Sequence, residues 1–151
     1  MFSGDTGRIV RVFKDQGEQR LAVEMGIMMA RAVPPGWTFD AVTFVPASLG
    51  AFRARGFDHA ELLARQVALA LGVPCRPLLQ RPRTRDQRLL TGGQRMKNLS
   101  QGFRLQVGAA PARRVILVDD VFTTGSTLCA ATDALMAGGS REVRGLTFAR
   151  V

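Results

Sequence analysis

The stretch VILVDDVFTTGST, residues 115–127, constrains the fold more than any other part of the sequence. It starts with four apolar residues, as expected for a parallel strand that is buried on both faces of a sheet, and we place this strand at 114–120. After two aspartates and a turn, residues 126–136 have the spacing of a helix, whose apolar face carries Leu128, Ala131 and Leu135. A buried strand that runs directly into a helix predicts an α/β fold with a parallel sheet.

Strands and helices also alternate along the rest of the chain. We predict a helix over 18–33, a strand over 39–46, a loop over 47–57 and a last strand over 142–151. A second helix starts after Asp58, which forms a capping-box-like pair with Glu61, and a short strand begins at Phe103. The apolar side of the first helix carries Leu21, Met25, Met28, Met29 and Ala32, and that of the second carries Ala60, Leu63, Ala64, Val67 and Leu71.

Length and composition fit one globular domain, residues 1–151, with an N-terminal helix region at 1–36 and a core at 37–151. No run approaches the roughly 18 apolar residues of a membrane span, and the N-terminus has no apolar signal-peptide core, so we expect a cytoplasmic protein. Two cysteines, Cys75 and Cys129, and a single histidine make a disulfide scaffold or a zinc site unexpected. For that histidine, His59, we expect a structural role.

The net charge is +9, and its distribution indicates an anionic partner. Between Arg76 and Arg104 the sequence holds eight basic residues and a single acid, Asp86. Such a cluster suits a polyphosphate ligand or nucleic acid. Residues 80–102 show little periodicity and much charge, which is typical of a functional loop in a compact domain.

The acidic pair and the turn behind it indicate the kind of ligand. Asp119 and Asp120 fall at the carboxyl end of a parallel strand, where α/β sheets bind ligands. The TTGST turn leads into a helix N-terminus, which suits a phosphate, and Gly125 allows close approach of the backbone. Carboxylates beside a phosphate repel it unless they contact another group, and vicinal sugar hydroxyls or a hydrated Mg²⁺ fit that role. Residue chemistry thus predicts a ribose 5-phosphate site.

The same stretch resembles the phosphoribosyl pyrophosphate (PRPP) signature of type I phosphoribosyltransferases. The blocks RGFDHAELLA, RPRTRDQ and RMKNLSQGF are similar to those of the ComF competence-protein family, a branch of that superfamily, and the likeness runs from about Phe13 to the end of the chain. This resemblance implies a type I phosphoribosyltransferase fold: a mainly parallel twisted sheet flanked by helices, with residues 1–36 as a hood and a flexible loop over the site.

The resemblance also implies a role for each matching residue. Asp119 and Asp120 would act in catalysis and hold the ribose hydroxyls, while the 5-phosphate would bind Thr123, Thr124, Gly125, Ser126 and Thr127. On the pyrophosphate side the candidates are Ala47, Ser48, Arg53 and Arg55, and in the flexible loop they are Arg81, Arg83, Gln87 and Arg95. Mg²⁺ would bind through PRPP and the two aspartates, with no direct protein site of its own.

Three functions stay open at this point. The chain could transfer phosphoribosyl from PRPP to a nitrogenous base with release of pyrophosphate, linked to DNA uptake or to nucleotide salvage. It could sense PRPP without turnover, or it could bind nucleic acid through its basic surface. Many family members carry a zinc ribbon before this domain, and we expect this chain to lack it. The acceptor base is not readable, and a homodimer is expected only by analogy with the fold.

Overall fold

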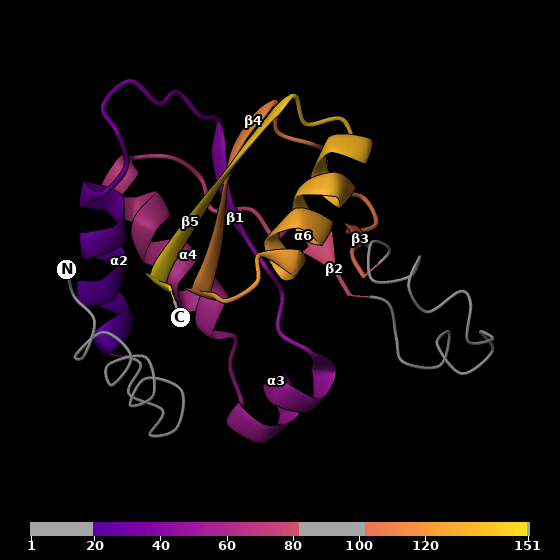
Figure 1. Ribbon diagram of the computed structural model, residues 1–151, viewed down its shortest axis with the longest axis horizontal. Helices are drawn as coiled ribbons and strands as arrows, with labels where there is room; N and C mark the ends of the chain where they lie inside the picture. Colours follow the sequence, from indigo (N-terminus) through magenta and orange to yellow (C-terminus); the bar gives the residue numbers. More distant parts are fainter. Residues whose placement is uncertain (1–19, 82–101, 151) are drawn as a thin grey trace.

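The computed structural model describes residues 20–81 and 102–150, which form an α/β domain (Figure 1). Its elements, in chain order, are α2 (Leu21–Arg31), β1 (Ala41–Phe44), α3 (Leu49–Arg55), α4 (His59–Leu71), β2 (Leu79–Gln80), β3 (Arg104–Leu105), β4 (Arg114–Phe122), α6 (Ser126–Ala137) and β5 (Glu142–Arg150). The alternation of strands and helices confirms the predicted fold class.

The main sheet has the strand order β1-β4-β5, and both pairings are parallel. A parallel bridge between Val42 and Cys75 adds one more segment beside β1. The strands β2 and β3 form a separate antiparallel pair, Leu79 opposite Leu105. Since β4 is the central strand, its carboxyl end lies between those of its two neighbours.

Helices cover both faces of the sheet, so β4 is buried on both sides as its sequence predicts. Ile116 and Val118 pack with α2 and α4 in one hydrophobic cluster. Val115 and Leu117 pack in a second cluster with α6 and the β2-β3 pair. In Figure 1 α2 and α4 accordingly lie on one side of the sheet and α6 on the other.

The predicted loop over 47–57 is wrong, because it contains the helix α3. Ser48 caps this helix: its Oγ accepts a hydrogen bond from the backbone N–H of Ala51 at 3.2 Å. The helix ends at Gly56, which has a φ of +77°. None of the residues of α3 is buried, so no apolar stripe marks it in the sequence.

The predicted apolar side of the first helix is partly wrong. Met28 is 54% exposed, and Ala32 follows the last residue of α2. The buried side instead carries Ala22, Met25, Gly26, Met29 and Ala30. A Cβ atom on Gly26 would lie 2.3 Å from the Cβ of Gln66 on α4, so the two helices approach closely. Because the helices lie so close, α2 turns the side with its small residues towards α4, and Met28 is left exposed.

One strand is longer than predicted, and the start of one helix agrees with its prediction. The strand β4 continues to Phe122, two residues beyond its predicted end at 120. Asp58 caps α4 as predicted, because its Oδ1 accepts from the N–H groups of Ala60 and Glu61 at 3.0 and 3.2 Å. The Glu61 carboxylate binds Arg65, one turn further along the helix, at 2.6 Å.

Candidate functional site

A cleft of about 320 Å³ lies where the parallel strands end, and we call it the carboxylate cleft. It lies among the end of β4, the loop after β1 and the first turn of α4. The chemically active side chains that line it are Asp58, Asp119, Asp120, Thr123, Thr127, Arg55, Arg81 and His59. The structure thus brings together residues that lie up to 82 positions apart in the sequence, since Val45 and Thr127 line the same cavity.

The acidic pair lies on the part of β4 that extends past β1. The last paired residue of β1 is Phe44, opposite Val118, whereas Asp119 still pairs with Thr147 of β5. Both aspartates are half-buried, and Asp119 Oδ1 accepts the backbone N–H of Asp120 at 2.9 Å. This geometry holds two carboxylates at the edge of the cleft.

The turn after β4 is shaped by one glycine. Gly125 has a φ of +77°, and a Cβ atom there would lie 2.9 Å from the ring of Phe122, so larger residues are strained on both counts. Thr124 Oγ1 lies 2.9 Å from Ser126 Oγ and accepts the N–H of Ser126 at 3.4 Å. The first backbone N–H groups of α6 have no partner within the helix, and they carry the positive end of its dipole. The turn is therefore suited to an anion.

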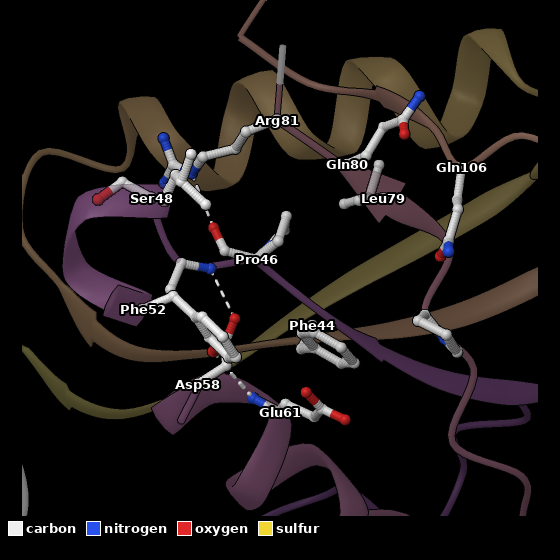
Figure 2. A pocket seen from close by; sticks show the side chains of 13 residues that line it. Phe44, Pro46, Ser48, Phe52, Asp58, Glu61, Leu79, Gln80, Arg81 and Gln106 are labelled. Carbon is white, nitrogen blue, oxygen red and sulfur yellow. Dashed lines mark hydrogen bonds between the residues drawn. The ribbon is translucent and has the colours of Figure 1, made fainter. Parts of the chain in front are cut away.

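The loop between β1 and α3 is held from two directions, as Figure 2 shows. The N–H of Ala47 donates to Asp58 Oδ2 at 2.6 Å, and Arg81 Nε donates to the carbonyl oxygen of Pro46 at 2.7 Å. The guanidinium of Arg81 also lies 4.6 Å from the ring centre of Phe103. We call the peptide unit Pro46–Ala47 the partition, because it separates this cleft from a second cavity.

Arg81, beside the partition, is subject to two opposing effects on its pKa. Burial lowers the pKa of the Arg81 guanidinium, while the negative charges of Asp119 and Asp58 oppose that shift. An arginine titrates so far above neutral pH that this side chain stays positively charged. A cation thus lies within electrostatic reach of the acidic pair, on the side of the cleft that the partition closes.

His59, for which we expect a structural role, also lies at the cleft. It is buried, with 3% of its surface exposed, and it still lines the carboxylate cleft. Its Nδ1 lies 3.4 Å from Arg55 Nη1, and its ring centre lies 4.8 Å from that of Phe57. The signal that could have revealed this is the spacing of four between Arg55 and His59, which orients the two side chains towards each other.

The predicted site residues fall into three groups. The cleft is lined by Asp119, Asp120, Thr123, Thr127, Ala47, Arg55 and Arg81. Five predicted residues do not line this cleft. Thr124, Gly125 and Ser126 shape the turn, Ser48 caps α3, and Arg53 lies on α3. The loop candidates Arg83, Gln87 and Arg95 lie outside the described residues.

Neither a protein-bound metal site nor a membrane span is found in the part of the chain that the structure describes. Within 20–81 and 102–150, no three His, Cys, Asp or Glu side chains come together to hold a metal ion. No helix in the same residues is long and apolar enough to cross a membrane.

Comparisons with known proteins identify relatives of this chain. Residues 56–151 match the family described as "Phosphoribosyl transferase domain". Competence protein F of Haemophilus influenzae is 38% identical over 112 residues, which cover 70% of this chain and 49% of that protein. The DNA utilization protein YhgH of Escherichia coli O6:H1 is 32% identical over 109 residues, covering 70% and 47%. The chain spans about half the length of these curated relatives.

Solved structures show the same fold at low sequence identity. The structure titled as the allosteric regulatory enzyme of purine biosynthesis has a TM-score of 0.61 at 22% identity and covers 86% of this chain and 26% of that one. An adenine phosphoribosyltransferase has a TM-score of 0.56 at 20% identity, covering 93% and 74%. This similarity is evidence for the type I phosphoribosyltransferase fold alone.

Proposed function

Because this chain belongs to the phosphoribosyl transferase domain family, as a ComF-like member, we propose that it binds PRPP in the carboxylate cleft. We further propose that it transfers the phosphoribosyl group to a nitrogenous base and releases pyrophosphate. The observation that carries this proposal is that Asp119, Asp120, Thr123 and Thr127 line one cavity together with Arg55. Groups suited to sugar hydroxyls, to a phosphate and to a second anion thus occur within a single cleft.

The arrangement gives PRPP one favoured orientation. Its ribose hydroxyls would donate to the carboxylates of Asp119 and Asp120, and its 5-phosphate would bind the turn that leads into α6. This leaves C1 and the pyrophosphate towards the partition, where Arg55 and Arg81 supply positive charge. Arginine suits this place because its planar fork can donate two hydrogen bonds to a phosphate.

In this orientation the reaction depends on positioning and charge. The bond between C1 and the pyrophosphate oxygen breaks, positive charge develops on the ribose ring, and a nitrogen of the acceptor forms the new bond from the opposite face. The aspartates would hold the sugar still, and the two arginines would stabilise the departing pyrophosphate. Mg²⁺ bound with the pyrophosphate would neutralise further charge, and carboxylates such as those of Asp119 and Asp120 are oxygen ligands that Mg²⁺ accepts.

The test is a calorimetric titration of PRPP with Mg²⁺ into the wild type and into the double variant Asp119→Ala, Asp120→Ala. We expect the variant to lose at least about 100-fold in affinity, because two charged hydrogen-bond acceptors are removed. Asp133→Ala is a matched control, since Asp133 is an exposed carboxylate on α6 that does not line the cleft. Unchanged PRPP affinity in the double variant would overturn the assignment of the site.

A second experiment separates transfer from sensing. We expect pyrophosphate release from PRPP when a purine, pyrimidine or pyridine acceptor is added to the wild type. Tight PRPP binding with no release for any acceptor would instead support a regulator that senses PRPP.

The names of the relatives favour a link to DNA as well. One is called a competence protein and another a DNA utilization protein, and this chain carries a net charge of +9. We propose that its basic surface contacts nucleic acid through phosphate groups, so that binding falls steeply with salt. If the Asp119→Ala, Asp120→Ala variant still binds DNA, this surface lies outside the carboxylate cleft. If DNA binding does not depend on salt, the proposed phosphate contacts are contradicted.

A further inference from the structure

The partition has a second cavity on its other side, with a volume of about 600 Å³. Figure 2 shows it between α3, the start of α4, the strand β2 and the segment that follows β3. We call it the aromatic cleft, and its characteristic lining residues are Phe44, Phe52, Glu61, Leu79, Gln80 and Gln106. A volume of this size is in the range that holds a small organic molecule.

The cavity combines an apolar interior with a few polar groups. Phe44 and Leu79 are buried at its base, with 7% and 4% of their surfaces exposed. Phe52, on the wall formed by α3, is 46% exposed although it is a large aromatic residue. Figure 2 shows the rings of Phe44 and Phe52 around the same space as the side chains of Glu61 and Gln106. Two aromatic faces with an amide and a carboxylate between them are typical of a site that stacks a planar ligand.

The charges of the lining argue against an anionic ligand. Its described charged residues are two acids, Asp58 and Glu61, and one cation, Arg81. Arg81 already donates to Pro46 and lies over the ring of Phe103. Glu61 also pairs with Arg65 at 2.6 Å, so the lining has no excess of positive charge although the chain carries +9. The cavity therefore offers an anion little, whereas an uncharged ligand with N–H groups would find acceptors.

The amides complete the chemistry. Gln80 and Gln106 each offer one carbonyl oxygen and one NH₂ group, so they can both donate to and accept from the edge of a heterocycle. The NH₂ group of Gln80 lies 3.4 Å from the carbonyl oxygen of Leu105, a long and weak contact that a ligand could replace. We propose that the aromatic cleft is a second binding site, for an uncharged planar nitrogen heterocycle of the nucleobase class.

This site is separate from the one that holds the reacting acceptor. Under the proposed function the pyrophosphate lies beside the partition, and the acceptor attacks C1 from the opposite face. The aromatic cleft lies behind the partition, so a heterocycle bound there cannot reach C1 in line. The two cavities share Pro46, Ala47, Asp58 and Arg81, which makes the partition a common wall through which one ligand can affect the other.

The test uses the full chain and four probes: adenine, hypoxanthine, cytosine and uracil. Binding of each is measured by saturation-transfer NMR and then by calorimetry for those that bind. We expect at least one probe to bind the wild type, and Phe52→Ala to weaken it about 5-fold or more, because base-aromatic stacking is lost. Gln106→Leu keeps the volume of the side chain and removes its hydrogen bonds, so it should weaken the same probe by a similar factor or less.

Two controls keep the result specific. Met136→Ala changes a residue on α6 that is 45% exposed, nearly as exposed as Phe52, and that lines neither cavity, so affinity should stay within about 2-fold. The Asp119→Ala, Asp120→Ala variant should bind the probe like the wild type even where it no longer binds PRPP. The proposal is overturned if no probe binds, if Phe52→Ala has no effect, or if the double variant also loses the probe. Because PRPP is titrated into the same samples, failure of the PRPP site is recorded separately.

Discussion

The two cavities on either side of the partition differ in how they are built. The carboxylate cleft takes Asp119, Asp120, Thr123 and Thr127 from one continuous stretch at the end of the central strand. The aromatic cleft takes one or two residues from each of several elements, including α3, none of whose residues is buried. A site at strand ends is held by the sheet, whereas a site walled by a surface helix depends on a few local contacts. The partition, Pro46–Ala47, and the side chains of Asp58 and Arg81 line both cavities.

The largest effect is expected from Asp58→Ala, which removes the contact that both cavities share. Asp58 is 8% exposed, and its carboxylate accepts from three backbone N–H groups, those of Ala47, Ala60 and Glu61. Loss of a helix cap and of a buried acceptor should lower the free energy of unfolding by about 2–4 kcal/mol, measured by urea denaturation. Affinity should fall for PRPP and for the heterocycle alike.

Asp58→Asn serves as the matched variant for that experiment. An asparagine keeps one acceptor oxygen and replaces the other with an NH₂ group, so it can retain either the cap of α4 or the contact with Ala47. We expect roughly half of the loss in unfolding free energy. If Asp58→Ala left one of the two affinities intact, the partition would not be the common wall that we infer.

A smaller effect, confined to one cavity, is expected from Gly125→Ala. The φ of +77° disfavours alanine, and the new Cβ would lie 2.9 Å from the ring of Phe122, which Arg150 covers at 5.4 Å. The strain should cost about 1–3 kcal/mol of unfolding free energy and displace the turn that we propose binds the 5-phosphate. PRPP affinity should fall by about 10-fold or more in calorimetry, while heterocycle affinity stays unchanged.

Gly36→Ala is the control for backbone substitution. Gly36 has no strained φ, and a Cβ atom there would meet nothing within 4 Å. Its unfolding free energy and both affinities should match the wild type within about 0.5 kcal/mol. Equal losses in the two glycine variants would mean that Gly125 has no special place in the site.

The comparison of the cavities also explains what the sequence could predict. The parallel sheet and the acidic pair were predictable because strand, carboxylates and turn follow one another within residues 114–127. The contacts that form the partition join residues 11 and 35 positions apart, which no local pattern records. The helix α3 was missed for a related reason: a helix without buried residues has no apolar period. For that reason the aromatic cleft could not be predicted from the sequence.

A more moderate loss is expected from Arg81→Lys, which keeps the charge and removes the planar fork. The Nε donor to Pro46 disappears, and the contact with the ring of Phe103 weakens. We expect a cost of about 1 kcal/mol in urea denaturation and a fall in PRPP affinity of a few fold. Arg53→Lys, at an exposed arginine of α3 that lines neither cavity, should change neither quantity. If the two lysine variants behaved alike, Arg81 would act by charge alone.

The smallest effect is expected at the opposite end of β4, far from both cavities. Arg114 Nη2 lies 2.7 Å from Asp40 Oδ1, and this hydrogen bond lowers the pKa of the Asp40 carboxyl below its ordinary 3.8. A lowered pKa in the folded state means that the pair stabilises the fold above about pH 4, and that this contribution disappears as the pH falls through the folded-state pKa. The pair is exposed, so its contribution to the stability of the fold is small. Thermal midpoints of the wild type and of Asp40→Asn should therefore differ slightly at pH 7 and approach each other as the pH is lowered, with PRPP and heterocycle affinities unchanged at pH 7. A difference in midpoint that does not shrink as the pH falls would mean that Asp40 stabilises β4 by its packing. A change in either affinity would mean that the two ends of β4 are coupled.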